Sequence, residues 1–143
     1  VAWADQRNGE NDTDIWVTRS SNRGDNWSAP IRVNQDSIGK HQFLPWLTID
    51  QTTGIVYLVY YDRRNFNDNQ TDVYLAWSID GGNKFSEAKI SETPFVPIDS
   101  KFLGDYTNIS AHKGIIAPVW TRMDDGKTKV ITTIIKQEDI IKK

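Results

Sequence analysis

The sequence predicts an all-β fold, a segment of a β-propeller with about two and a half blades of four antiparallel strands each. Short segments rich in Val, Ile, Tyr, Trp and Thr alternate with turn clusters of Gly, Asn and Asp. No long helical periodicity appears before the tail. A phrase at positions 14–28 returns at positions 72–86, an offset of 58, and four strands fit within one such period, as in a propeller blade.

Taken in order, the predicted elements fall into three units. Residues 1–42 form an incomplete first blade, residues 43–91 a complete second blade, and residues 92–143 an incomplete third blade. The Pro-rich stretch at 92–97 is a loop between blades, because strand-like patterning resumes after it. Strands are expected at Val1–Asp5, Asp14–Ser20, Ile31–Asn34, Leu44–Asp50, Ile55–Tyr61, Asp72–Ser78, Ala88–Ser91, Ile109–Ala111, Ile115–Trp120 and Lys129–Ile135.

Hairpin patterns and sequence patterns that recur between units support these boundaries. The turn at 52–54 joins two adjacent strands of the second unit, and residues 111–116 have the same hairpin pattern in the third. The segment 119–122 repeats the pattern of 59–62. The charged tail at 136–143 is expected to fray.

Composition narrows the class of partner. The net charge is −2, from 17 basic and 19 acidic residues that are interspersed, so we expect no nucleic-acid partner and no polybasic membrane anchor. No apolar run approaches the roughly 20 residues that span a bilayer, so we expect no membrane insertion. Cysteine is absent, which excludes disulfides and Cys-based zinc sites. The chain opens at Val1 inside a strand-like segment, and we expect a processed or partial polypeptide.

Two turns of the repeat share the pattern Ser-x-Asp-x-Gly-x-x-Trp/Phe, with Asn in place of Asp in the first copy. A short Asp or Asn side chain accepts hydrogen bonds from turn amides, Gly supplies a positive φ, and the aromatic ring packs over the hairpin. The pattern therefore predicts a structural turn and not a catalytic site. Its residues are Ser20, Asn22, Gly24 and Trp27 in the first copy and Ser78, Asp80, Gly82 and Phe85 in the second.

This turn resembles the Asp-box of the bacterial neuraminidase repeat. The phrases at 3–9, 61–65 and 102–109 also look like those of bacterial Asp-box proteins related to exo-sialidases and other glycoside hydrolases. The resemblance implies a sialidase-like, six-bladed propeller of about 350 residues, of which this chain is a part. It further implies a secreted or cell-surface protein that is directed at carbohydrate or glycoconjugates and needs no cofactor.

The resemblance also implies a set of catalytic residues. A retaining sialidase uses three arginines around the substrate carboxylate, a tyrosine nucleophile with a glutamate partner, and an aspartic acid. Arg7, Arg64 and Arg122 end matching strands and are the candidate substrate-binding residues, with Tyr106 as candidate nucleophile and Asp62 as candidate acid. The set is incomplete, because no Phe/Tyr-Arg-Ile-Pro motif is present.

A structural interpretation of the same residues competes with the catalytic one. Asp–Arg pairs two residues apart are able to join neighbouring loops, Asp5 with Arg7 and Asp62 with Arg64. Tyr106 then has only a packing or backbone-bonding role. The six tryptophans are expected mainly in the core rather than in a sugar site.

Metal binding has weak support in the sequence. The acidic loops that lead to Asp14 and Asp72 hold enough oxygen ligands for calcium, yet neither has EF-hand spacing. We expect turns in which Asp14 and Asp72 bond turn amides, with calcium as the alternative. His41 and His112 sit in no metal-ligand spacing, so no metal site is predicted.

Three functions remain open at this point. The chain is a segment of a sialidase-like glycoside hydrolase whose catalytic residues are divided between it and further blades. Alternatively, it belongs to a non-catalytic propeller that binds glycans or proteins at a bacterial surface. In the third hypothesis, the chain assembles with copies of itself, because incomplete blades leave unpaired strand edges that can pair with another copy. A complete arginine triad favours the enzyme, whereas its absence together with aromatic-lined loops favours binding.

Overall fold

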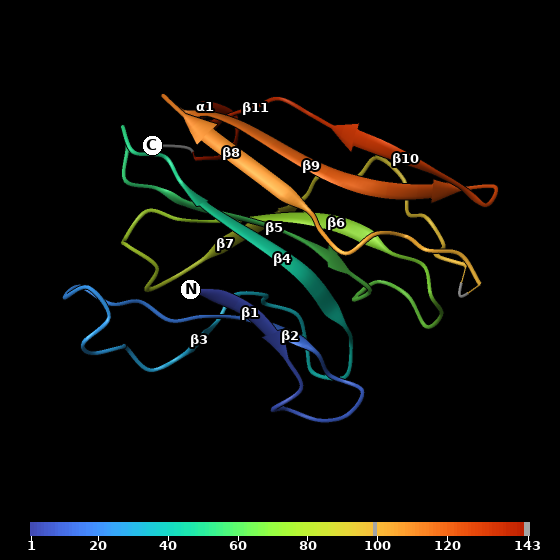
Figure 1. Ribbon diagram of the computed structural model, residues 1–143, viewed down its shortest axis with the longest axis horizontal. Coiled ribbons are helices and arrows are strands. Elements are labelled where there is room, and N and C mark those ends of the chain that lie inside the picture. Colours follow the sequence, from blue (N-terminus) through green and yellow to red (C-terminus); the bar gives the residue numbers. More distant parts are fainter. Residues whose placement is uncertain (99, 142–143) are drawn as a thin grey trace.

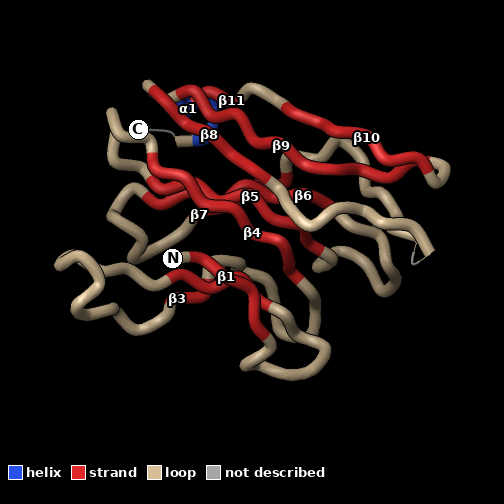
Figure 2. Tube along the Cα trace, viewed as in Figure 1, coloured by secondary structure: helices blue, strands red, loops and turns tan. Residues whose placement is uncertain are grey.

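The computed structural model describes residues 1–98 and 100–141, and this part of the chain forms three successive antiparallel sheets with one short helix (Figures 1 and 2). Figure 1 shows the sheets stacked face to face in chain order, with the complete four-stranded sheet in the middle. The predicted fold class, an all-β segment of a β-propeller, is confirmed.

The first sheet has the order β1 (Ala2–Asp5), β2 (Asp14–Val17) and β3 (Ile31–Arg32). The last strand is shorter than the predicted Ile31–Asn34 because a side chain replaces the backbone beyond Arg32. The Val33 amide still donates to the Ile15 carbonyl at 2.8 Å, but the Ile15 amide donates to the side-chain oxygen of Asn34 at 2.8 Å.

The second sheet is complete and has the order β4 (Gln42–Ile49), β5 (Val56–Asp62), β6 (Asp72–Ser78) and β7 (Ser86–Lys89). Its last strand begins and ends earlier than the predicted Ala88–Ser91. Its early end has the same cause as that of β3, because the Val73 amide donates to the Ser91 hydroxyl at 3.0 Å in place of a backbone carbonyl.

The third sheet contains β8 (Asn108–His112), β9 (Ile115–Asp124), β10 (Lys127–Thr132) and β11 (Ile135–Lys136), followed by α1 (Gln137–Ile140). The single strand predicted at Lys129–Ile135 is wrong, since β10 and β11 pair with different parts of β9. At the break, Thr132 Oγ1 donates to the Pro118 carbonyl at 2.9 Å, and Pro118 itself has no backbone donor for a ladder.

The tail does not fray between positions 136 and 141, contrary to expectation. The Gln137 amide donates to the Gly114 carbonyl at 2.8 Å, which holds the start of α1 against the β8–β9 hairpin. Residues 142–143 of the predicted frayed tail lie outside the described part of the chain. Among the described residues, no helix has the length and apolar character required to cross a membrane.

Two hydrophobic clusters hold the sheets together, and both use β5. Successive side chains of a strand point to opposite faces, so β5, which is buried on both faces, contributes alternate residues to each cluster. The cluster between the first and second sheets contains Ile15, Val17, Val33, Val56, Leu58, Tyr60, Ala76 and Phe85. The cluster between the second and third sheets contains Ile55, Tyr57, Val59, Tyr61, Val73, Leu75, Phe95, Ile109, Ile116, Trp120 and Met123.

Candidate functional site

Polar side chains gather where β5 ends and β4 and β6 begin. The register of these strands pairs Asp62 with both Gln42 and Asp72, so the three residues lie side by side at one end of the second sheet. Asp14 starts β2 at the matching end of the first sheet, opposite Asp5. All of these side chains except Asp5 are buried, and a buried polar group requires hydrogen-bond partners.

Asp14 receives its hydrogen bonds from side chains. Arg32 Nε and Asn34 Nδ2 each donate to Asp14 Oδ1 at 2.6 Å, and Asn8 Nδ2 donates to Asp14 Oδ2 at 2.6 Å. The expected bonding of Asp14 to turn amides is therefore wrong. The ionic and amide donors together compensate a carboxylate that is fully buried.

Asp72 repeats this arrangement in the second blade. Ser91 Oγ donates to Asp72 Oδ1 at 2.9 Å, Asn65 Nδ2 donates to Asp72 Oδ2 at 3.3 Å, and Lys89 Nζ lies 3.8 Å from Asp72 Oδ1. The expectation that Asp72 bonds turn amides is likewise wrong. In the first and second blades, β2 and β6 thus begin with a buried carboxylate bound by an Asn from the preceding loop and by two residues that belong to the next strand or follow it.

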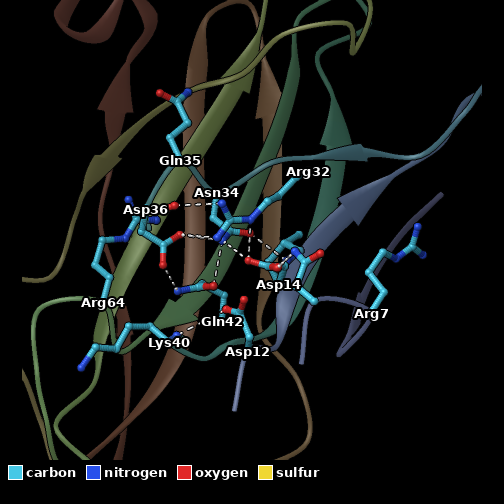
Figure 3. Close-up of polar contacts among 12 residues, drawn as sticks. Arg7, Asp12, Asp14, Arg32, Asn34, Gln35, Asp36, Lys40, Gln42 and Arg64 are labelled. Carbon is cyan, nitrogen blue, oxygen red and sulfur yellow. Dashed lines mark hydrogen bonds and ion pairs between the residues drawn. The ribbon is translucent and has the colours of Figure 1, made fainter. Parts of the chain in front are cut away.

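A chain of carboxylates and amides joins the first blade to the second (Figure 3). The side-chain amide of Asn34 reaches Asp36 Oδ1 at 2.7 Å and Gln42 Oε1 at 2.8 Å. Gln42 Nε2 in turn reaches Asp36 Oδ2 at 3.1 Å and Asp62 Oδ1 at 3.4 Å. Since Gln42 and Asp62 belong to the second sheet and Asn34 follows the first, this network fixes the two blades relative to each other.

Arg64 is enclosed by two carboxylates. Its guanidinium contacts Asp62 Oδ2 at 2.6 Å, binds both oxygens of Glu87, and lies 4.1 Å from the centre of the Tyr74 ring. Burial lowers the pKa of Arg64, but the hydrogen bonds to Glu87 and Asp62 raise it by more, so the net shift is upward. Glu87 is bound further by the hydroxyl of buried Tyr60 at 2.5 Å.

Burial raises the pKa of the Asp62 carboxyl, and the hydrogen bonds from Arg64 oppose this shift without cancelling it. Asp62 has no exposed surface. A catalytic acid must be accessible to its substrate, and this carboxyl is enclosed by protein in the described part of the chain. Asp62 binds Arg64 and Gln42 in this geometry, and its catalytic role stays a prediction.

The other two candidate arginines are also paired within their own blades. The Arg7 guanidinium contacts Asp5 at 2.5 Å and lies 4.2 Å from the centre of the Trp16 ring. The hydrogen bonds that Arg7 donates to Asp5 hold the pKa of Asp5 well below its usual range. Arg122 contacts Asp124 at 2.7 Å.

The strand that carries Arg122 does not end there as predicted, because β9 continues to Asp124. Arg122 also donates to the carbonyls of Thr93 and Pro94 in the loop between the second and third blades. Figure 3 shows Arg7 and Arg64 on opposite sides of the group formed by Asp14, Asn34 and Gln42. Among the described residues, the three arginines make no contact with one another, and their binding of substrate stays a prediction.

Tyr106 is the exposed tyrosine of the five, with 73% of its surface accessible. Its ring meets the Trp46 ring edge-on, at a centroid distance of 6.4 Å and an interplanar angle of 87°. Both rings line a groove of about 410 Å³ between the second and third blades. The structure therefore places Tyr106 in an aromatic groove whose lining includes neither Asp62 nor any of the three candidate arginines.

The two turns with the shared pattern have matching hydrogen bonds. Ser20 Oγ donates to Asn22 Oδ1 at 2.9 Å and accepts from the Gly24 amide at 2.8 Å. Ser78 Oγ donates to Asp80 Oδ1 and accepts from the Gly82 amide, both at 2.8 Å.

Both glycines of these turns have positive φ, +98° at Gly24 and +87° at Gly82, a region that L side chains adopt at a cost. The two aromatic residues differ, because Phe85 is buried between blades whereas Trp27 is 51% exposed. The turns lie at the ends of β2 and β6 that are distant from Asp14 and Asp72, so they take no part in the polar cluster.

In the described part of the chain, no group of three or more His, Cys, Asp or Glu side chains is placed to hold a metal ion. His41 instead shares a hydrogen bond with Thr13 Oγ1 at 3.0 Å, and His112 is exposed on β8.

Sequence reasoning missed the residues that organise the polar cluster, namely Arg32, Asn34, Gln42 and Glu87. One signal was available, because Asn8 and Asn65 precede Asp14 and Asp72 at similar spacings in the two copies of the repeat. The contact between Asp36 and Gln42 had no such signal in the sequence, since these side chains meet only after the blades pack.

The fold is that of a segment of a sialidase-like β-propeller. Among solved structures, the chain is similar to the protein titled Hadza microbial sialidase Hz136, with a TM-score of 0.63 and 14% sequence identity. The similarity covers 92% of this chain and 32% of that one, so the chain spans about a third of the sialidase. No family model matches the sequence, and no curated protein matches it.

Proposed function

We propose that this chain is part of an Asp-box, sialidase-like propeller that recognises glycans outside the cell, as a secreted or cell-surface protein. The observation that carries the proposal is the superposition of 92% of the chain on a segment of a microbial sialidase. The hydrogen-bonded turns at Ser20–Trp27 and Ser78–Phe85 support the Asp-box assignment, because they recur at the same place in two blades.

Binding, rather than hydrolysis, is the activity that the described residues support best. A carboxylate clamp needs guanidinium groups that are free to meet substrate, whereas Arg7, Arg64 and Arg122 are each paired with a carboxylate of the protein. Asp62 is buried and bound to one of them. An exposed aromatic groove, in contrast, is open to ligand.

A glycan array tests this proposal directly. The purified 143-residue chain is applied to immobilised glycans that include sialylated, neutral and sulfated structures, and bound chain is measured as a function of concentration. We expect saturable binding to a defined subset that an excess of the same free glycan displaces. Absence of saturable binding to every glycan, from a chain with the far-UV spectrum of a β protein, overturns the proposal.

Hydrolysis is the second candidate, and the exposure of Tyr106 is the observation that favours it. If Tyr106 is the nucleophile, the chain together with the remaining propeller blades, or with further copies of itself, cleaves a fluorogenic sialoside. Tyr106→Phe then abolishes turnover and leaves glycan binding intact. Turnover that persists in Tyr106→Phe rejects this role for the residue.

A further inference from the structure

The groove beside Trp46 and Tyr106 is built from two blades. Trp46 comes from β4 of the second blade, and Tyr106 lies in the segment that leads into β8 of the third. The groove has a volume of about 410 Å³, within the range of small-molecule pockets, which is about 300–1,000 Å³. The other lining residues are Thr107, Asn108, Val119, Trp120, Thr121 and Val130.

The two rings form an open corner. They stand nearly perpendicular, at 87°, and 39% of Trp46 and 73% of Tyr106 is exposed. An aromatic face that remains accessible to solvent is a platform for a flat apolar surface, and the C–H face of a pyranose ring is such a surface. The perpendicular ring then limits where the sugar lies on the platform.

Polar groups beside the corner are free to bind hydroxyls. Within the described part of the chain, the Asn108 amide and the Thr121 hydroxyl have no hydrogen bond to another side chain or to the backbone, while Thr107 Oγ1 is engaged by the Leu44 carbonyl at 2.8 Å. An amide and a hydroxyl each donate and accept, which suits the alternating donors and acceptors of a sugar.

Charge sets the class of sugar. None of the lining residues is an Asp, Glu, Lys, Arg or His. A carboxylated sugar moved into such a groove loses hydration without gaining a cationic partner, which costs binding free energy. A neutral sugar has no such cost, so the groove discriminates against acidic residues rather than selecting them.

We infer that the Trp46–Tyr106 groove is a subsite for an uncharged pyranose. The inference rests on the proposed glycan recognition and gives it a location and a ligand class. It assigns the chain a neutral-sugar contact, in contrast to the acidic sugar that the name of the similar sialidase implies for that protein.

The test measures binding of neutral and sialylated forms of one oligosaccharide to the 143-residue chain by calorimetry, with Trp46→Ala as the variant. Trp27→Ala is the matched control, because Trp27 is similarly exposed, at 51%, but lies in a turn at a distance from the groove. We expect Trp46→Ala to weaken binding of the neutral form by about tenfold or more, the equivalent of about 1.4 kcal/mol, and Trp27→Ala to leave it unchanged.

Tyr106→Ala guards against a folding defect, since Tyr106 is the more exposed ring and its loss is expected to weaken binding while the unfolding midpoint is unchanged. Binding that survives both groove variants, or that requires the sialic acid, overturns the neutral-sugar subsite and leaves the proposed glycan recognition standing. Absence of binding to every form by the unmodified chain overturns glycan recognition itself, so the two failures are distinguishable.

Discussion

The side-chain amide of Asn34 binds the buried carboxylate of Asp14 at 2.6 Å while its oxygen accepts the backbone amide of Ile15 at 2.8 Å. One side chain thereby satisfies both a buried charge and a strand amide that has lost its backbone partner. Ser91 performs the same pair of tasks for Asp72 and Val73 in the second blade. The same arrangement is therefore repeated at the start of β2 in the first blade and of β6 in the second.

Replacement of Asn34 tests this arrangement. We expect Asn34→Ala to lower the free energy of unfolding by roughly 2–4 kcal/mol, because Asp14 loses a donor and the Ile15 amide loses its acceptor in a buried site. Urea unfolding measures the change. The exposed variant Gln51→Ala serves as control, and an equal, small loss in both variants contradicts the assigned role.

Two equivalent arginines are expected to differ because their burial differs. Arg64→Lys removes a fork that joins Asp62 and Glu87 in a site where the Arg64 side chain is 14% exposed, and we expect a loss of roughly 1–3 kcal/mol. Arg7→Lys changes the matching pair at 39% side-chain exposure, where solvent screens the interaction, so its effect on stability is much smaller. Equal losses in urea unfolding contradict this account.

The aromatic residues of the two turns provide another matched pair. Phe85 is 8% exposed and packs between the first and second blades, so Phe85→Ala is expected to cost about 3–5 kcal/mol of stability. Trp27 is 51% exposed, and Trp27→Ala is expected to cost less than about 1.5 kcal/mol. Thermal unfolding of both variants decides the point, and a reversed order rejects it.

The lowered pKa of Asp50 predicts that the stability of the protein depends on pH in the acid range. Burial raises the pKa of Asp50, but hydrogen bonds from Thr52 and from the Gly114 amide at 2.7 Å lower it by more, so the pKa lies below its usual range. A carboxyl with a lowered folded pKa stabilises the protein above its unfolded pKa, about 3.9, and this contribution is lost as the pH falls further.

The variant Asp50→Asn removes that titration. We expect it to be less stable than the unmodified chain at pH 7 and to lose less stability between about pH 4 and pH 2. Urea midpoints measured across this range give the slope. Asp25→Asn, at an exposed position, is the control, and an unchanged slope in Asp50→Asn shows that another group carries the acid dependence.

Prediction from sequence succeeded where the determinants are local. The turn patterns located the loops after β2 and β6, and the Asp–Arg pairing of Asp5 with Arg7 and of Asp62 with Arg64 was among the stated alternatives. It failed at strand ends, where a distant side chain competes with the backbone. β3 and β7 both stop early because Asn34 and Ser91 take over a strand amide from positions 19 and 18 residues away.

The sequence by itself determined the architecture of this protein, because strand alternation, turn residues and a repeat offset are properties of neighbours along the chain. Only the tertiary structure decided which polar residues meet. Glu87 reaches Arg64 across the sheet, Gln42 links Asp36 to Asp62, and Tyr106 meets Trp46 at a groove between blades. These contacts arise from the pairing of strands within the second sheet and from the packing of one blade on the next, and no local pattern encodes them.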